Sequence, residues 1–484
     1  MRHWKPQADP PIALEEEDAP MTSNPTQTQT QAIKARRAGI ASFVGTTIEW
    51  YDFYIYGLAA SLVFGDLFFS PDMDRGVATL MSFVTFWVGF LARPVGGVIF
   101  GHLGDRIGRK TTLVITLLMM GLATTCIGLL PTYGSIGVMA PVLLVLLRFI
   151  QGVAVGGEWG GAVLIASENA PKGKSVLYSA FAQQGAPAGN LLAIGVFFLL
   201  SMADTPDFLL NGGWRVPFLL SSVLIAIGLI IRLSIEDAQD VRKLLKENRE
   251  QNVQPVREAI RGHWPLILLG AGTLPIIYVT YIKTSFALSW ATKTLGYDSG
   301  TFLSLISVAV IVQCITQPFG AILMNRMDMR KAVLMFTVPE FFLVPLMFYG
   351  IYSMNYWFAM ITMALATIPH GMYYGAIAGV LARAFPARVR YSGLSLANQL
   401  GAVTVGGGTP VLLQFLLNKT GSIIPVAIVS GGYALVSLIC VLIVLRMTGT
   451  DARELSNAER EDAEDLAGLS ALTAEPAGVV RTAS

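Results

Sequence analysis

Twelve long apolar stretches, separated by short polar connections, run through most of this 484-residue chain. Each is about as long as the roughly 20 mostly apolar residues that an α-helix needs to cross a bilayer. They cover residues 38–64, 78–102, 111–131, 139–167, 175–202, 213–235, 265–291, 300–324, 331–351, 354–382, 391–417 and 423–447. The pattern predicts an all-α membrane protein with twelve transmembrane helices in two six-helix halves.

The polar segments divide the chain into five regions. We expect a disordered cytoplasmic tail over residues 1–37, a six-helix bundle over 38–235, a charged cytoplasmic linker over 236–264, a second bundle over 265–447 and a cytoplasmic tail over 448–484. The first tail is rich in Pro, Thr and Gln and cannot bury a core. Met21 opens a conventional polar leader, so it is a candidate for the true first residue.

Lys and Arg predict the orientation. The connections after the second, fourth, eighth and tenth helices carry Arg106, Arg109, Lys110, Lys172, Lys174, Arg326, Arg330, Lys331, Arg388 and Arg390. The connections at the opposite end carry Arg75, Arg215, Lys293 and Lys419. Because cytoplasmic loops carry the positive excess, both termini are expected inside, in agreement with an even number of helices.

Composition supports a multi-pass membrane protein and argues against other classes. The chain is 53% hydrophobic and 14% charged, with a mean hydropathy of +0.58, whereas soluble domains carry about 25% charged residues. The net charge of +2 gives no reason to expect a nucleic-acid partner. The three cysteines fall in separate apolar stretches, and no metal-ligand cluster or nucleophile–base spacing stands out, so neither an enzyme nor a bound cofactor is expected.

The two halves resemble each other weakly. Pro171 precedes Gln184 by thirteen positions, and Pro386 precedes Gln399 by the same interval. Such internal symmetry is typical of transporters built from repeats, whose solute site lies near the middle of the membrane between the halves.

The first apolar stretch carries two acids, Glu49 and Asp52. An ionisable side chain inside the hydrocarbon layer costs at least ~2.5–3.5 kcal/mol, so it usually serves the passage of ions or substrates. A spacing of three predicts that both acids share a helix face with Gly45 and Tyr56. Two carboxylates that close cannot both ionise cheaply, which indicates a proton-coupling site. The alternative is a structural pair bonded to neighbouring Tyr or Arg side chains.

Two arginines lie inside predicted helices, Arg93 in the second and Arg148 in the fourth, with Gln151 one turn further on. Either could neutralise a membrane acid or bind a substrate carboxylate in a bidentate manner. A static ion pair is the competing interpretation for each. We assign Arg148 to the proton-coupling group.

Lys283 in the seventh helix is the residue that says most about the chemical class of the cargo. A lone ammonium in an apolar helix requires an anion, although the side chain could instead reach the outer surface. Glu340 and His370, in the ninth and tenth helices, are weaker candidates, and His370 is as easily a packing residue.

Amides in the fifth and eleventh helices are candidates for lining a solute site. Gln184, Asn190, Asn398 and Gln399 can bind hydroxyl or carboxyl groups, and with Tyr56 and Lys283 they form the predicted substrate-binding set. Hydrogen bonding between helices is an equally good explanation. Glycines four residues apart, such as Gly152, Gly156 and Gly160, are interpreted as packing and gating surfaces.

Several motifs narrow the class of protein. They are Phe100-Gly-His-Leu-Gly-Asp-Arg-Ile-Gly-Arg-Lys110, Glu49-Trp-Tyr-Asp-Phe-Tyr, Leu91-Ala-Arg-Pro-Val-Gly-Gly-Val-Ile-Phe, Arg148-Phe-Ile-Gln-Gly, Gly156-Gly-Glu-Trp-Gly-Gly, Gly213-Trp-Arg-Val-Pro-Phe and Phe385-Pro-Ala-Arg-Val-Arg-Tyr-Ser-Gly393. Over about residues 37–447 the chain resembles the metabolite:proton symporter branch of the major facilitator superfamily. That branch includes permeases for shikimate, 2-oxoglutarate, citrate, dicarboxylates and proline or betaine.

The resemblance implies the major facilitator fold, a bacterial inner-membrane location and a gating role for the loop motif of Gly101, Asp105, Arg106, Gly108, Arg109 and Lys110. It implies that Asp105 docks near the start of the eleventh helix and closes the inner side. It also favours a structural or coupling ion pair for Arg93, which we group with Glu158, because relatives with different cargoes share Arg93. Asn325 departs from the family pattern, since many relatives place an acid there.

These observations predict a monomeric secondary transporter that imports a small organic anion with protons by alternating access, with the proton as coupling ion. Hydroxylated, keto or dicarboxylate metabolites are the first choice of cargo. The alternative is a zwitterionic osmolyte such as proline or betaine, which an aromatic cage built from Trp50, Tyr51, Tyr281 and Trp290 could hold.

Overall fold

The structure is a computed structural model that describes residues 43–107, 109–156, 180, 183–203, 208–234, 255–386 and 389–448. Within these ranges the regular elements are all helices, as the sequence predicted. Seven helical stretches, several of which join consecutive elements, are long and apolar enough to cross a membrane, and three shorter apolar helices accompany them among the described residues.

The first half follows the predicted order of spans. Residues 43–59 are helical and continue into η1 (Ala60–Phe64) and α2 (Gly65–Phe68). The other elements are α3 (Arg75–Leu91), α4 (Arg93–Ile107), α5 (Arg109–Leu129), α6 (Tyr133–Ile136), α7 (Met139–Val155), α10 (Gly185–Ser201), η2 (Leu209–Gly213) and α11 (Arg215–Ser234). The predicted helix 78–102 is divided at Ala92, because Pro94 supplies no backbone N–H to the preceding turn.

The second half begins with α13 (Pro255–Gly272), which bends at His263 ahead of Pro265. The seventh span then changes its winding repeatedly, through η3 (Pro275–Tyr278), α14 (Val279–Tyr281), η4 (Ile282–Ala287), α15 (Leu288–Trp290) and η5 (Ala291–Leu295). The remaining elements are α16 (Ser299–Arg326), α17 (Met329–Tyr352), α18 (Tyr356–Ala384), α19 (Arg390–Gly401), η6 (Ala402–Gly406), α20 (Gly408–Thr420) and α21 (Ile424–Thr448). Of the predicted linker, the structure describes only the part from Pro255 onwards.

Helices in each half pack closely where glycines repeat. A Cβ atom on Gly152 of α7 would lie 2.1 Å from the carbonyl oxygen of Gly89, and one on Gly156 would lie 2.0 Å from that of Arg93. The second half repeats this contact between α16 and α18, where Gly320 would meet the Met372 carbonyl at 2.1 Å. Backbone-to-backbone contact of this kind holds membrane helices together without a hydrophobic driving force.

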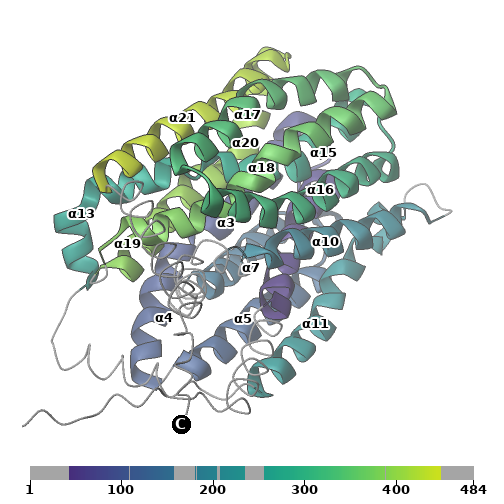
Figure 1. The fold of residues 1–484 in the computed structure, drawn as a ribbon. Coiled ribbons are helices and arrows are strands. Elements are labelled where there is room, and N and C mark those ends of the chain that lie inside the picture. The colour runs from purple at the N-terminus through teal and green to yellow at the C-terminus, as the bar shows by residue number, and fades with distance from the viewer. Residues whose placement is uncertain are drawn as a thin grey trace, which may run out of the picture.

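The two halves meet along a limited set of helices. In Figure 1 the blue helices α4, α5 and α7 of the first half lie below the green and yellow helices of the second half, with α3 and α10 near the boundary. α3 contacts η6 and α20, and α10 contacts α16. At one end of the bundle, Lys293 Nζ lies 3.2 Å from the carboxylate of Asp66, which joins the ends of the first and seventh spans. We call this end the Asp66 end.

The packing at Gly152 can be tested by Gly152→Ala. The added methyl group has no room against the Gly89 carbonyl, so we expect a loss of about 1–3 kcal/mol of stability and a lower thermal unfolding temperature in detergent. Gly195→Ala on α10 is the matched control, because a Cβ there meets nothing within 4 Å. Equal unfolding temperatures for the two variants would show that the α3–α7 crossing is not close-packed.

Candidate functional site

A cavity of about 60 Å³ lies between the two halves. Its lining comes from both halves and consists of Glu49, Trp50, Phe53, Tyr54, Arg93, Val155, Gln183, Ile277, Tyr278, Thr280, Tyr281, Tyr374, Asn398 and Gln399. Glu49 lies 17 residues before Asp66, or about 25 Å along a helix, so the cavity is well separated from the Asp66 end.

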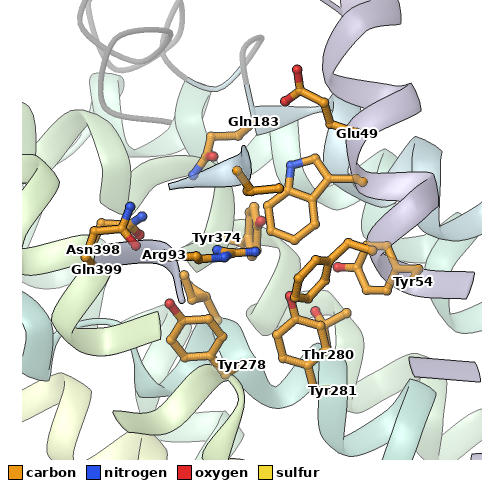
Figure 2. Close-up of a pocket in the computed structure, with 14 residues that line it drawn as sticks. Glu49, Tyr54, Arg93, Gln183, Tyr278, Thr280, Tyr281, Tyr374, Asn398 and Gln399 are labelled. Carbon is orange, nitrogen blue, oxygen red and sulfur yellow. The ribbon is translucent and has the colours of Figure 1, made fainter. Parts of the chain in front are cut away.

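Arg93 lies in the middle of these lining residues (Figure 2), with Tyr278 and Tyr374 beside it and Glu49 further away. The side chain is 7% exposed, and its guanidinium carbon lies 4.6 Å from the ring centroids of both Phe53 and Phe90. In the described part of the chain, no acid forms an ion pair with it, and its Nε has no hydrogen-bond partner. The cavity therefore offers a buried cation whose Nε–H can donate to an anion.

Amide side chains form one wall of the cavity. Asn398 and Gln399, in the last turn of α19, lie together on one side of Arg93 (Figure 2). Gln399 donates through Nε2 to the Gly156 carbonyl at 2.6 Å, and its Oε1 has no partner among the described residues. This bond links the eleventh span to the end of α7, while the free oxygen can accept a hydrogen bond from a solute hydroxyl.

Asp52 lies outside the cavity, fully buried within the first half. Ser221 of α11 donates to Oδ1, and the Thr124 hydroxyl of α5 lies 3.4 Å from Oδ2. Gln151 donates to Thr124 at 2.8 Å and accepts in turn from the Arg148 guanidinium. Hydroxyl groups can donate or accept, so Ser221 and Thr124 can satisfy Asp52 in either protonation state.

Arg148 is fully buried in a cage of aromatic rings. Its guanidinium carbon lies 4.1 Å from the ring centroid of Tyr56, 4.3 Å from that of Phe53 and 5.0 Å from that of Phe86. Nε and Nη2 have no hydrogen-bond partner in the described ranges. Arg148 reaches Asp52 through Gln151 and Thr124 rather than by direct pairing, so the network connects the two charges without neutralising them in contact.

Phe53 connects the cavity to this network. Its ring lies against Arg93 on the cavity side and against Arg148 on the side of Asp52. Phe53 also follows Asp52 directly in the chain. A change in the position of either guanidinium therefore presses on the same ring and the same turn of helix.

The two acids of the first span face different surroundings in this conformation. Glu49 lines the cavity, whereas Asp52 points to α5 and α11. Side chains three residues apart on an α-helix point in directions that differ by about a sixth of a turn. Here that difference is enough for Glu49 to face the cavity while Asp52 faces the interior of the bundle. Their assignment to proton coupling stays a prediction.

The predicted substrate-binding residues divide into two groups. Asn398 and Gln399 line the cavity, but Tyr56, Gln184, Asn190 and Lys283 do not. Tyr56 donates to Thr85 at 2.7 Å, Gln184 donates to the Cys314 carbonyl at 2.8 Å, and Lys283 donates to Thr367 at 2.8 Å. Asn190 is fully buried in α10, with neither side-chain atom hydrogen-bonded among described residues. These four residues lie outside this cavity in this conformation, and their assignment to substrate binding stays a prediction.

The loop motif can be placed only in part. Gly101, Asp105 and Arg106 belong to α4, and Arg109 and Lys110 begin α5. Their side-chain contacts, and Gly108 and Glu158 as a whole, lie outside the described part of the structure. The gating role of Asp105 and the proposed grouping of Arg93 with Glu158 remain predictions.

Sequence reasoning missed Gln183 and three of the cavity tyrosines, Tyr54, Tyr278 and Tyr374. Gln183 is the neighbour of the predicted Gln184 in the chain. The prediction therefore identified the right segment, but the side chain that lines the cavity is one position earlier. Of the aromatic residues proposed as a cage, Trp50 and Tyr281 line the cavity, whereas Tyr51 donates to the Pro217 carbonyl instead. Among the described residues no group of three or more His, Cys, Asp or Glu could hold a metal.

Two bundles of membrane-length helices with buried charges around a cavity between them define the class of a secondary transporter. Comparison with known proteins agrees with this class. The sequence profile of the Major Facilitator Superfamily matches residues 42–409. The chain is 38% identical over 400 residues to the shikimate transporter of Escherichia coli (strain K12), which covers 82% of this chain and 91% of that protein.

Other relatives and a solved structure extend the comparison. The glycine betaine/proline/ectoine/pipecolic acid transporter OusA of Dickeya dadantii (strain 3937) is 33% identical over 396 residues, covering 80% of this chain and 78% of that protein. The structure of the proton:xylose symporter XylE bound to 6-bromo-6-deoxy-D-glucose matches with a TM-score of 0.68 at 14% identity, covering 86% of this chain and 96% of that one.

The chain belongs to the major facilitator superfamily and falls in its metabolite:proton symporter branch. Membership confirms the predicted fold class of twelve transmembrane helices in two halves. It also makes the protein a transporter rather than an enzyme.

The cavity lining can be tested with two buried asparagines from opposite halves. In a variant in which Cys126, Cys314 and Cys440 are replaced by Ala, Asn398→Cys should react with a small water-soluble thiol reagent faster than Asn190→Cys. Asn398 lines the cavity, whereas Asn190 is fully buried in α10 and is not part of the lining. Equal labelling rates in proteoliposomes would contradict this placement of the cavity.

Proposed function

We propose that this protein is a proton-coupled symporter that imports a small organic anion across the bacterial inner membrane by alternating access. It acts as a monomer in the bilayer and uses the proton as its coupling ion, with no other cofactor. The proposal extends the transporter class, which the family establishes, to a cargo and a mechanism.

The observation that carries the proposal is the buried guanidinium of Arg93 in the cavity between the halves, which forms no ion pair among the described residues and whose Nε has no hydrogen-bond partner there. A buried cation is costly, and a carboxylate that enters the cavity lowers that cost while making charge-assisted hydrogen bonds. The planar guanidinium suits bidentate binding of a carboxylate.

The remaining lining suits a small hydroxylated or keto acid. Gln183, Asn398 and Gln399 offer amide donors and acceptors, and the ring faces of Tyr278 and Tyr281 supply apolar walls. The similarity to a shikimate transporter supports a cargo of this chemistry. A cyclic or short-chain monocarboxylate with hydroxyl groups can hydrogen-bond to the amides and pack its carbon skeleton against the tyrosine rings.

Asp52 is the proposed proton carrier of the first half. Its hydroxyl partners tolerate both protonation states, and Phe53 links it mechanically to Arg93. When the anion binds, Arg93 moves towards it, and Phe53 passes the displacement to Arg148 and the Asp52 network. With a single proton and a monoanion, the transport cycle moves no net charge across the membrane. Each additional elementary charge that crosses changes the free energy of transport by ~2.3 kcal/mol per 100 mV of membrane potential.

The Asp66 end is proposed to face the periplasm. The connections at this end carry few Lys and Arg residues, as expected of an external face. The Asp66–Lys293 contact, the bond from Trp87 Nε1 to the Val403 carbonyl at 2.7 Å and the close approach of Gly57 to Ser285 join the halves on that side of the cavity. In this conformation the external side is therefore closed.

A zwitterionic osmolyte is the second candidate cargo. The cavity contains Trp50, Tyr54, Tyr278, Tyr281 and Tyr374, and aromatic rings bind quaternary ammonium groups. Arg93 opposes this reading, because it already occupies the centre of the aromatic lining with a positive charge. The similarity to a betaine and proline transporter keeps the candidate open to test.

Cargo class can be tested by uptake into proteoliposomes under an inward proton gradient. Labelled shikimate, other hydroxy and keto monocarboxylates, a dicarboxylate, proline and glycine betaine form the panel. We expect accumulation of a carboxylate without an ammonium group, and Arg93→Gln should weaken its affinity by about 1.5–3 kcal/mol, or roughly tenfold to 150-fold. Arg215→Gln is the control, since Arg215 donates to the Gly128 carbonyl outside the cavity. Accumulation of betaine alone would replace the anion by the osmolyte, and no accumulation of any compound would refute the proposal.

Asp52→Asn separates coupling from binding. The variant should still exchange labelled for unlabelled cargo across the membrane but lose accumulation against a concentration gradient, because Asn cannot carry the proton. Asp72→Asn, in an exposed loop, should accumulate cargo like the wild type. Undiminished gradient-driven accumulation by Asp52→Asn would remove Asp52 from the coupling role.

A further inference from the structure

A second group of ionisable side chains lies inside the other half of the molecule. Lys283 of η4, Glu340 of α17 and His370 of α18 are all fully buried, and none of them lines the cavity. The proposed mechanism uses none of them. Ionisable groups in the interior of a membrane bundle are costly and usually serve a function.

Glu340 is the least satisfied member of this cluster. Neither carboxyl oxygen accepts a hydrogen bond from any described residue. Lys283 acts on Glu340 electrostatically, but its ammonium is hydrogen-bonded to Thr367 and forms no direct ion pair with the carboxyl group in the described ranges. A permanently ionised carboxylate would be expensive in this position, and a permanently protonated one would leave Lys283 without an anion. The site is therefore suited to gaining and losing a proton.

His370 connects the cluster to the cavity. Its Nδ1 lies 3.0 Å from the Ile276 carbonyl, which can only accept, so Nδ1 carries the proton and donates. Nε2 lies 2.9 Å from the Thr280 hydroxyl and is therefore its acceptor. Thr280 lines the cavity, and His370 belongs to α18, the helix that packs against α17 and its Glu340. Thr280 and His370 thus form a polar link that leads from the cavity towards α17.

Other titratable groups are distant or uncharged. α17 packs against α16, α18, α21 and η5. Besides His370, these elements carry Cys314, Arg326, Tyr356, Tyr373, Tyr374, Arg383, Tyr433, Cys440, Arg446 and Lys293, and α17 itself carries Arg330, Lys331, Tyr349 and Tyr352. The Lys and Arg members of this set lie at or near helix ends. Lys283 is the charge that faces Glu340.

We propose that Glu340, with Lys283 as its counter-ion and Thr280 and His370 on its path to the cavity, is a second proton-binding site, independent of Asp52. A proton from cavity water converts the Glu340 carboxylate to the acid, and its release returns the negative charge to the neighbourhood of Lys283. The inference deepens the proposed symport: with both sites in use, one monoanion enters with two protons and a net positive charge.

The proton itself is the probe, so the test needs no cargo. Purified protein in nanodiscs is titrated from mildly acidic to mildly alkaline pH, and the protons released are counted with a pH-indicator dye. Compared with wild type, Glu340→Gln should release one proton fewer, Asp52→Asn one fewer, and the double variant two fewer. Asp72→Asn, a control in an exposed loop outside both clusters, should match the wild type.

Lys283→Met identifies the proton carrier within the cluster. Removing the nearby positive charge should make Glu340 hold its proton more tightly without lowering the number of protons bound. A loss of one proton in Lys283→Met, equal to that in Glu340→Gln, would assign the proton to the lysine and overturn the proposal.

Infrared spectroscopy covers the case in which Glu340→Gln does not fold. In a Glu49→Gln, Asp52→Asn background, the difference spectrum between acidic and alkaline pH should still contain the C=O band of a buried carboxylic acid. Its absence, or an unchanged proton count in folded Glu340→Gln, would refute the second site. Either result would leave the proposed transport through Arg93 and Asp52 intact, because uptake is measured separately.

Discussion

Two guanidinium groups that share one phenylalanine ring are the constraint around which the first half is arranged. Arg93 and Arg148 are both buried, and both lie within 5 Å of the Phe53 ring centroid. Neither forms an ion pair among the described residues, so aromatic faces and amides supply what carboxylates would supply in a structural salt bridge. The resulting positive potential stays available, on one side to a cargo and on the other to a protonatable acid.

The fold could be predicted because its determinants are local. Runs of apolar residues about as long as the bilayer is thick define the spans, and glycines spaced by four define the closest crossings. Arg93 and Asn398 could be identified as unusual residues in apolar helices from the sequence alone. Their common cavity depends on contacts between distant helices, which spacing along the chain does not reveal.

Residues that the sequence placed on one helix face point to different surroundings in the structure, and this difference has a physical cause. Thr280 and Lys283 would share a face on a regular α-helix, but η4 begins at Ile282 and places more residues in each turn. Thr280 therefore reaches the cavity while Lys283 points into the second half, towards Thr367. Glu49 and Asp52 face different surroundings for another reason. Their helix lies at the boundary between the cavity and the bundle interior, so nearby positions on it face one or the other.

The irregular winding of the seventh span has a consequence for how the cargo preference of such a protein could evolve. Its 3₁₀, α and π segments follow one another within Pro275–Leu295, and the first two bring Tyr278, Thr280 and Tyr281 to the cavity, whereas η4 directs Lys283 to Thr367. One residue inserted into or deleted from this span would rotate everything beyond it by about 100°. New chemistry could thereby be presented to the solute without substituting any of the existing lining residues, through a change of length alone.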